Sequence, residues 1–243
     1  FQQKVETDAG KKGDSGMEDR MFKIYSPGDS KVVMKVIPGH FVTSHSHITH
    51  YVDMTTLRAR QNEAEAAARL LASRYAHNTI VDTIICLNGC EVIGAYLAQE
   101  LTKSGIMCMN AHGTIYITSP EQDINGQMIF RDNAKIMVEG KNVLILSTSI
   151  TTGVTLDKAI DSVEYYGGKV QGIASVFSFI SKARGIEVNS IFDAKDLKGY
   201  ASYDAKVCPM CKAKQKIDAI VNGYGYSRSE ERRVGKECRS RWS

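Results

Sequence analysis

The chain has 243 residues, of which 43% are hydrophobic and 24% are charged, an ordinary composition for a globular protein. This length allows one large domain or two small ones. The formal net charge is only +4, and no apolar run approaches the roughly 18 residues of a membrane-spanning helix. We expect no membrane partner and, since no secretory signal is recognisable, a cytoplasmic location.

Two terminal segments are expected to lie outside the fold. Residues 1–20 are polar and glycine-bearing, which favours a disordered leader. Residues 228–243 have no apolar periodicity and resemble the in-frame translation of a sequencing-library adapter, so we interpret them as an artefactual tail. This segment carries six Lys/Arg and three Asp/Glu, and without it the net charge is +1. Basicity therefore gives no reason to expect a nucleic-acid partner. The alternative is a genuine basic tail.

The segment after the leader predicts a β-hairpin. Residues 21–36 alternate around a Pro-Gly-Asp turn, and Pro38 and Gly39 are expected to end the second strand. His45, His47 and His50 follow. Imidazoles are common metal ligands, but on a strand the first two would share one face and His50 the other. We interpret these histidines as hydrogen-bonding or solvated; the alternative is that one of them contacts a base or a phosphate.

Helices and strands alternate in the middle of the chain. The clearest helix covers residues 55–76, a strand covers 81–86, and a helix covers 91–104. Between the last two, Gly89 lets backbone amides approach an anion closely, although a plain strand-to-helix turn is an equal alternative.

Residues 106–110 are the next predicted strand, and residues 114–118 and 127–130 form a hairpin pattern around the turn residues SPEQDING. Strands are also predicted at 169–178 and 187–193, separated by a short helical segment at 179–182. Gly167 and Gly168 are expected to cap the helix before them. The alternation predicts an α/β fold with a parallel, doubly wound sheet.

The most informative stretch is residues 142–155, NVLILSTSITTGVT. Residues 143–146 form a continuous apolar run typical of a central strand. A turn rich in hydroxyls and containing Gly153 follows, and then a helix predicted at 156–166. A strand, a glycine turn and a helix N-terminus together make an anion site, because free N–H groups and the helix dipole point to the same place. We expect a phosphate there; the alternative is an ordinary turn without a ligand.

At these residues the chain resembles the type I phosphoribosyltransferases, and the orotate phosphoribosyltransferases most closely. Their motif is four apolar residues, two acidic residues, two apolar residues and Thr-Thr-Gly-x-Thr. Residues 143–146 match the strand of the motif. Ser147 and Thr148 stand where the family has its two catalytic carboxylates. The positions that match the loop around the 5′-phosphate of phosphoribosyl pyrophosphate are Thr151, Thr152, Gly153, Val154 and Thr155.

The resemblance also implies roles for residues elsewhere. The pyrophosphate-binding loop would be Leu87, Asn88, Gly89 and Cys90. Phe41 and Tyr51 would contact the base from a small N-terminal hood at residues 21–54, which precedes a core at 55–200. A mobile loop in the family supplies a lysine, and the predicted hairpin here offers Arg131 as its replacement.

The function implied by the resemblance is transfer of a phosphoribosyl group to a nucleobase such as orotate, in nucleotide biosynthesis. The family uses Mg²⁺ with phosphoribosyl pyrophosphate and usually forms homodimers. Because the acidic pair and the loop lysine are missing here, the alternative is a catalytically impaired regulatory protein that binds phosphoribosyl pyrophosphate or a nucleotide.

A pair of cysteines, Cys208 and Cys211, lies in the segment at 201–227. Two thiolates spaced in this way can bind one metal ion, form a disulfide or remain free. A structural zinc ion needs four ligands, so the other two would come from distant residues or from another subunit. Structural Zn²⁺, free thiols and redox chemistry all remain open at this point.

Overall fold

The computed structural model describes residues 5–7, 16–103, 108–111, 113–123 and 126–228. The chain forms two compact units. The first, which we call the terminal unit, combines Phe1–Ile24, Met34–Thr55 and Leu197–Ser243. The second, the central unit, combines Tyr25–Val33 and Thr56–Asp196.

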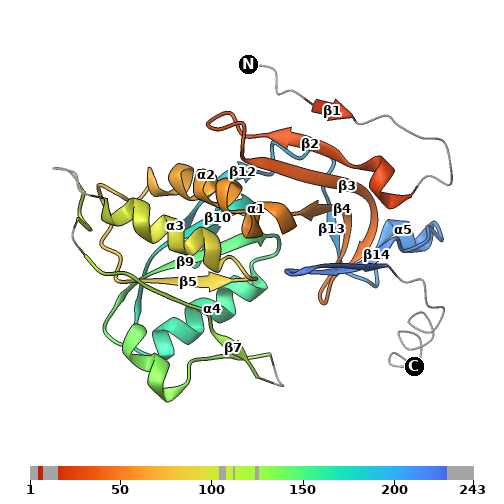
Figure 1. Ribbon diagram of the computed structural model, residues 1–243. Helices are drawn as coiled ribbons and strands as arrows, with labels where there is room; N and C mark the ends of the chain where they lie inside the picture. The colour runs from red at the N-terminus through yellow and green to blue at the C-terminus, as the bar shows by residue number, and fades with distance from the viewer. Residues whose placement is uncertain (1–4, 8–15, 104–107, 112, 124–125, 229–243) are drawn as a thin grey trace. The chain divides into compact units, whose positions relative to one another are not determined.

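The central unit is built on a six-stranded sheet in the order β11-β12-β10-β9-β5-β6 (Figure 1). Its strands are β5 (Thr83–Leu87), β6 (Tyr116–Thr118), β9 (Asn142–Ile150), β10 (Lys169–Ser178), β11 (Lys182–Ala183) and β12 (Ile186–Asp193). All neighbouring pairs are parallel except β11 and β12. The predicted parallel α/β sheet is thereby confirmed.

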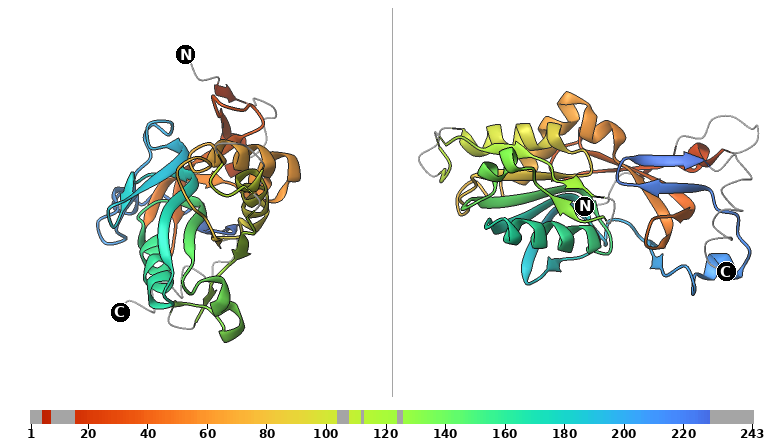
Figure 2. Two further views of the ribbon diagram at one scale, coloured as in Figure 1. Left: turned by 90° about the vertical axis from the view of Figure 1, so that its left-hand side faces the viewer. Right: turned by 90° about the horizontal axis from the view of Figure 1, so that it is seen from below.

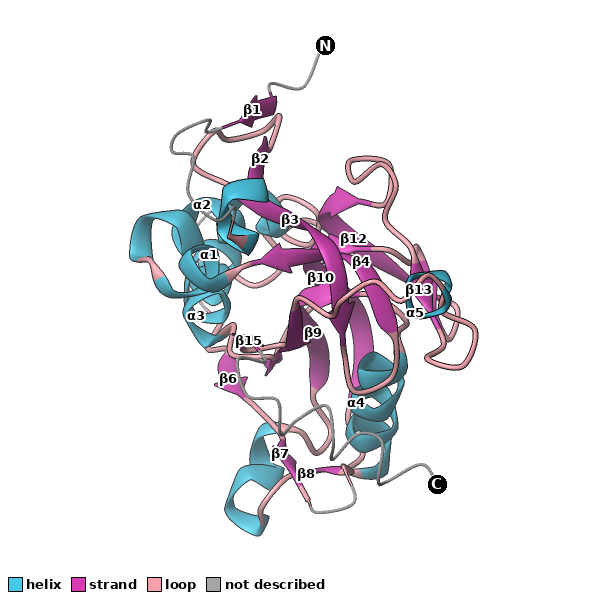
Figure 3. Cartoon of the chain, turned by 90° about the vertical axis from the view of Figure 1, so that its right-hand side faces the viewer, coloured by secondary structure: helices cyan, strands magenta, loops and turns pink. Residues whose placement is uncertain are grey.

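Helices cover both faces of this sheet. The helices α2 (Gln61–Ala72) and α3 (Glu91–Thr102) lie on one face, and α4 (Val154–Tyr165) lies on the other (Figures 2 and 3). Because α3 follows β5 and α4 follows β9, the chain leaves these two adjacent strands toward opposite faces. Open α/β sheets bind ligands at the carboxyl ends of the strands at such a topological switch point.

The core beneath α4 is apolar and fully enclosed. Ile145 and Val143 of β9 and Ile160 of α4 have no exposed surface and belong to one buried cluster. On the other face, Gly94 lets α3 pack closely on β5, since a Cβ atom there would lie 2.5 Å from Cys86 Sγ. The central strands are buried on both faces, which explains their continuous apolar sequence.

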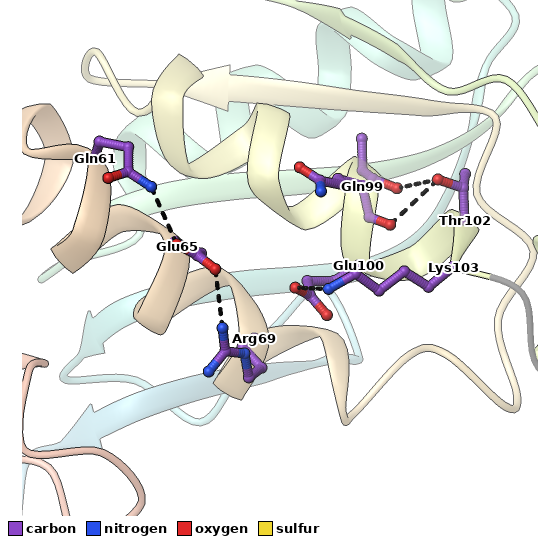
Figure 4. Close-up of polar contacts among 8 residues, drawn as sticks. Gln61, Glu65, Arg69, Gln99, Glu100, Thr102 and Lys103 are labelled. Atoms are coloured by element: carbon purple, nitrogen blue, oxygen red, sulfur yellow. Dashed lines mark hydrogen bonds and ion pairs between the residues drawn. The ribbon is translucent and has the colours of Figure 1, made fainter.

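The outer surfaces of α2 and α3 carry local polar contacts (Figure 4). Glu65 accepts hydrogen bonds from Gln61 and Arg69, and Lys103 pairs with Glu100. The Arg69–Glu65 pair is spaced i,i+4, a geometry that contributes about 0.3–0.5 kcal/mol at an exposed position. These contacts keep the outer helix faces solvated.

Two predictions for the middle of the chain are corrected. The helix expected at 55–76 is divided into α1 (Thr55–Ala59) and α2, because Arg60 adopts an extended conformation. The short helix expected at 179–182 is absent from these residues, where a bend leads into β11, which pairs with β12. The glycine cap is confirmed: Gly167 N–H donates to Glu164 O, and Gly168 N–H donates to Val163 O.

The hairpin expected between 114–118 and 127–130 is only partly present. β6 joins the main sheet as a parallel edge strand beside β5, and the hairpin forms between β7 (Glu121–Gln122) and β8 (Met128–Ile129). The 3₁₀ helix η2 (Asp132–Met137) leads from there to β9. The strand expected at 106–110 is also corrected, since residues 109–111 form a turn; residues 104–107 lie outside the described residues.

The terminal unit contains a seven-stranded sheet with the path β1-β2-β3-β14-β15, in which β4 pairs with β3 and β13 pairs with β4. The strands are β1 (Val5–Thr7), β2 (Phe22–Tyr25), β3 (Val33–Val42), β4 (His47–Asp53), β13 (Ser202–Tyr203), β14 (Ala219–Asn222) and β15 (Gly225–Arg228). The unit also contains the short helix α5 (Pro209–Lys212).

Three predictions are corrected in this unit. Pro38 and Gly39 do not end the strand; β3 continues to Val42 with a register shift between Pro38 and Phe41. Part of the segment expected to be a disordered leader is ordered, since β1 pairs with β2 and η1 (Met17–Arg20) follows. Arg228, counted as tail, ends β15 opposite Ala219, while residues 229–243 lie outside the described residues.

None of the helices in the described part of the chain combines the length and apolarity needed to cross a membrane.

Candidate functional site

The turn after β9 presents a helix N-terminus at the switch point. Gly153 is the N-cap residue of α4 and adopts the left-handed conformation, with φ of 83°. The helix begins at Val154, two residues earlier than expected, and Asp157 N–H makes its first bond, to Gly153 O. The N–H groups of the first turn have no intrahelical acceptor. The turn thus provides backbone donors and the positive end of the helix dipole.

The predicted phosphate-binding residues surround these donors. Thr152 is exposed, Thr151 and Thr155 are partly exposed, and Gly153 is buried. Val154 is 39% exposed. The chain before the turn is fixed, because Phe179 N–H donates to Ile150 O at 2.8 Å. The structure therefore brings Thr151, Thr152, Gly153, Val154 and Thr155 together as a loop that is open to an anion and anchored on β9 and β10.

The turn after β5 lies beside this loop. Asn88 and Gly89 both have positive φ angles, 61° and 73°. Asn88 Nδ2 donates to Ser147 Oγ at 3.4 Å, which links the turn to the end of β9. Arg58, at the end of α1, donates to Asn88 O at 2.8 Å. This supporting arginine was not predicted, because its position on a helix far from the motif gives no local signal in the sequence.

The side chains of Leu87 and Cys90 point into the protein, with 4% and no exposed surface. Cys90 Sγ donates to Leu146 O at 3.3 Å, and burial raises the pKa of this thiol well above its usual range. Any contact of these two residues with a pyrophosphate would use backbone groups, while Asn88 offers a side chain as well.

Ser147 and Thr148 are part of β9 itself, whereas the sequence suggested that the turn begins with them. They are only 2% and 1% exposed. Ser147 Oγ donates to Ser149 O at 3.2 Å, and Ser147 lies in register with Leu87 on β5. At this edge of the sheet the two positions offer small, neutral hydroxyls.

Arg131 lies after the β7–β8 hairpin and pairs with Glu121 of the same hairpin. Its Nη2 atom is 2.7 Å from Glu121 Oε2, and both side chains are exposed. The ion pair lowers the pKa of Glu121. The ion pair links Arg131 to the hairpin. Arg131 would therefore have to leave Glu121 in order to contact a pyrophosphate.

The base-binding role expected for Phe41 and Tyr51 does not fit their burial. Phe41 has no exposed surface and Tyr51 has 6%. Their ring centroids are 5.8 Å apart, and Tyr51 also packs edge-on against Tyr226 at 5.4 Å. Both rings belong to the core of the terminal unit, because the bulge in β3 turns Phe41 inward.

The two cysteines of the C-x₂-C pair lie in the terminal unit, at the start of α5 and inside it. His40 and His47 face them, and the metal-binding atoms of these four side chains all lie within 4.8 Å of one another. His47 Nδ1 lies 2.9 Å from His40 Nε2, so His47 is hydrogen-bonded as predicted, whereas no role was predicted for His40.

The topology, the two turns and the phosphate-loop pattern agree with the result of family comparison. Residues 53–199 match the model of the phosphoribosyl transferase domain. The chain belongs to this family. The matched residues include β5, β9 and both turns described above.

Curated relatives share the same affiliation. The chain is 26% identical over 191 residues to an orotate phosphoribosyltransferase from Pelotomaculum thermopropionicum, covering 77% of this chain and 90% of the relative. It is 28% identical over 185 residues to an orotate phosphoribosyltransferase from Chlorobium phaeobacteroides, covering 76% and 88%.

Among solved structures, the orotate phosphoribosyltransferase of Mycobacterium tuberculosis in complex with Fe(III) dicitrate aligns with a TM-score of 0.45 and 18% identity, covering 67% of this chain and 91% of that one. The UMP synthase of Leishmania donovani aligns with a TM-score of 0.48 and 17% identity, covering 67% and 34%.

The donor set at the end of β9 does not fit a magnesium ion held by the protein. Mg²⁺ binds through carboxylates together with substrate phosphates and water, whereas Ser147 and Thr148 offer hydroxyls that are almost completely buried. A magnesium ion would therefore arrive as part of the phosphate substrate.

Proposed function

We propose that this protein binds phosphoribosyl pyrophosphate at the switch point between β5 and β9 and transfers its phosphoribosyl group to a nucleobase such as orotate. The observation that carries the proposal is the open α4 N-terminus at Gly153 beside the turn at Asn88 and Gly89. Two adjacent anion-binding turns suit a substrate with two separated phosphate groups.

The expected rate follows from the neutral residues at the end of β9. The two carboxylates of the family's motif are missing here, and a hydrogen bond to each of them would be worth about 1.5–3 kcal/mol. If both act in the transition state, their loss slows the reaction by roughly a hundred- to ten-thousandfold, at about 1.4 kcal/mol per decade. We therefore expect binding of phosphoribosyl pyrophosphate with weak or undetectable transfer to orotate.

The test combines isothermal titration with an assay of orotidine 5′-phosphate formation. Replacing Thr152 by Asp puts a negative charge beside the loop amides, and we expect the affinity for phosphoribosyl pyrophosphate to fall at least tenfold, equivalent to about 1.4 kcal/mol. Ser30→Asp is the control, because Ser30 is exposed in a turn and its replacement adds the same charge elsewhere on the central unit.

Unchanged affinity in Thr152→Asp would show that this loop is not the phosphate site. Binding without any transfer, to orotate or to other free bases, would favour a regulatory role over an enzymatic one. Transfer at several turnovers per second, on a general enzyme scale of about 1–1000 per second, would show that the acidic pair is dispensable here.

A further inference from the structure

Four metal-binding side chains converge in the terminal unit. They come from three places in the sequence: His40 from the bulge in β3, His47 from the first position of β4, and Cys208 and Cys211 from the turn that forms α5. His40 has no exposed surface, Cys208 has 1% and His47 has 9%. Cys211 lies on the solvent side of the group.

The separations of the ligand atoms suit a single tetrahedral ion. His40 Nε2 is 2.9 Å from His47 Nδ1 and 3.8 Å from Cys208 Sγ. Cys211 Sγ is 3.6 Å from His40 Nε2 and 3.2 Å from His47 Nδ1. Zinc bonds of about 2.3 Å to sulfur and about 2.0 Å to nitrogen place neighbouring ligands about 3.3–3.8 Å apart. These four separations differ from the zinc values by less than half an ångström, and the other two, from Cys208 Sγ to Cys211 Sγ and to His47 Nδ1, are within 4.8 Å.

The surroundings of His40 fix its ring in the orientation that a metal requires. His40 Nδ1 lies 3.0 Å from Gln215 O, so the proton on Nδ1 points to the carbonyl and Nε2 keeps its lone pair for a metal ion. Metal-binding histidines usually donate their second N–H to a carbonyl or carboxylate in this way. The carbonyl belongs to the chain that leaves α5, so the cysteine turn also orients the histidine.

The backbone at His40 is held equally firmly. His40 N–H donates to Asp218 Oδ2 and Asp218 N–H donates to His40 O, both at 2.8 Å. Gly39 makes this approach possible, since a Cβ atom there would lie 2.4 Å from the Asp218 carboxylate. The Pro38–Gly39 bulge therefore aims the imidazole of His40 at the cysteines.

We propose that His40, His47, Cys208 and Cys211 of one chain bind a structural Zn²⁺ ion. A set of two imidazoles and two thiolates in a tetrahedron is the preferred environment of zinc. All four positions are filled by the protein, so none is open to a substrate, which makes the site structural. The ion joins strands β3 and β4 to a segment about 160 residues later in the chain.

The proposed zinc site lies outside the sequence of the phosphoribosyl transferase domain. The family match covers residues 53–199, and all four ligands lie outside it. Metal binding and transfer of the phosphoribosyl group can therefore be tested separately.

The first experiment measures metal content in the full chain, purified without chelator, by inductively coupled plasma mass spectrometry. We expect one zinc ion per chain in the parent. Cys208→Ser and His40→Ala should lose it, whereas Cys108→Ser and His45→Ala should keep it, because these matched residues lie outside the group. A chain without zinc, with a different metal or with a disulfide between Cys208 and Cys211 would overturn the proposal, as would half an ion per chain, which would mean ligands shared between subunits.

The second experiment does not depend on variants that fold. X-ray absorption at the zinc edge of the parent protein should show two sulfur neighbours at about 2.3 Å and two nitrogen neighbours at about 2.0 Å. Four sulfur neighbours, or nitrogen and oxygen neighbours alone, would show that zinc binds elsewhere and would overturn the assignment.

Discussion

Gly153 holds the turn before α4 in a conformation that other residues adopt only at a cost. Its φ is 83°, and a Cβ atom would lie 3.0 Å from Ile180 Cδ1. An L-residue in this region costs roughly 1–2 kcal/mol. We expect Gly153→Ala to lower the free energy of unfolding by about that amount and to weaken binding of phosphoribosyl pyrophosphate, because the turn would shift its amides away from the anion.

The control for this prediction is Gly185→Ala. Gly185 has φ of 82°, and a Cβ atom added there would have no other atom within 4 Å, so its replacement carries the same conformational cost outside the predicted loop. Chemical denaturation and titration of both variants separate the two effects. Equal affinity in the two variants would contradict the phosphate-loop assignment.

At the scale of elements, α5 ends in an arrangement that normally uses glycine. Lys214 N–H donates to Cys211 O, and Gln215 N–H donates to Met210 O, which is the Schellman pattern. Lys214 occupies the left-handed position, with φ of 56°. The same pattern at the end of α4 has Gly167 at this position.

We therefore expect Lys214→Gly to stabilise the protein. Removing the left-handed lysine recovers about 1–2 kcal/mol, and the greater freedom of glycine in the unfolded chain offsets about 0.4–1 kcal/mol of this. Thermal unfolding should show a melting temperature a few degrees higher, at about 2–4 °C per kcal/mol for a chain of this size. Lys212→Gly, inside α5, is the matched control and should lower it; a rise in both would refute the capping argument.

Strand identity was predictable from the sequence where strands are buried on both faces. The predicted bounds of β10, which is buried from Gly172 to Ser178, agree with the structure, because a buried strand can be recognised without its partner. The predicted bounds of β12, most of whose residues are only partly buried, differ by one residue. The pairing of short strands was not predictable. Residues 114–118 alternate like a hairpin strand, yet β6 pairs in parallel with β5. This pairing depends on contacts between residues that are distant in sequence.

The candidate metal site was also predictable only in part, because one of its residues, His40, lies at a β-bulge. The C-x₂-C spacing indicated a metal but not the histidines that face the cysteines. A register shift between Pro38 and Phe41 interrupts the regular alternation beside His40, as β-bulges re-aim side chains. The Pro38–Gly39 pair was the available signal for this bulge. Because the pair was interpreted as a strand end, no role was predicted for His40, the next residue.

At the scale of the whole molecule, the two units differ in how their segments are joined. The central unit is almost continuous in sequence, whereas the terminal unit assembles segments on both sides of it. Bringing such distant segments together carries a loop-closure cost that a metal cross-link can offset. The proposed zinc ion connects two distant segments of the terminal unit, so its loss should affect this unit selectively.

Hydrogen exchange measures this directly. After removal of zinc with a chelator, we expect amide protection to fall in β3, β4, β13 and β14, since ligand binding stabilises only the folded form that binds it. Protection in β5, β9 and β10 should remain, because their hydrogen bonds and buried core belong to the central unit. Added Zn²⁺ should restore the first set. Loss of protection in all seven strands together would mean that the chain unfolds as one cooperative body, and unchanged protection throughout would mean that the terminal unit holds its segments together without the ion.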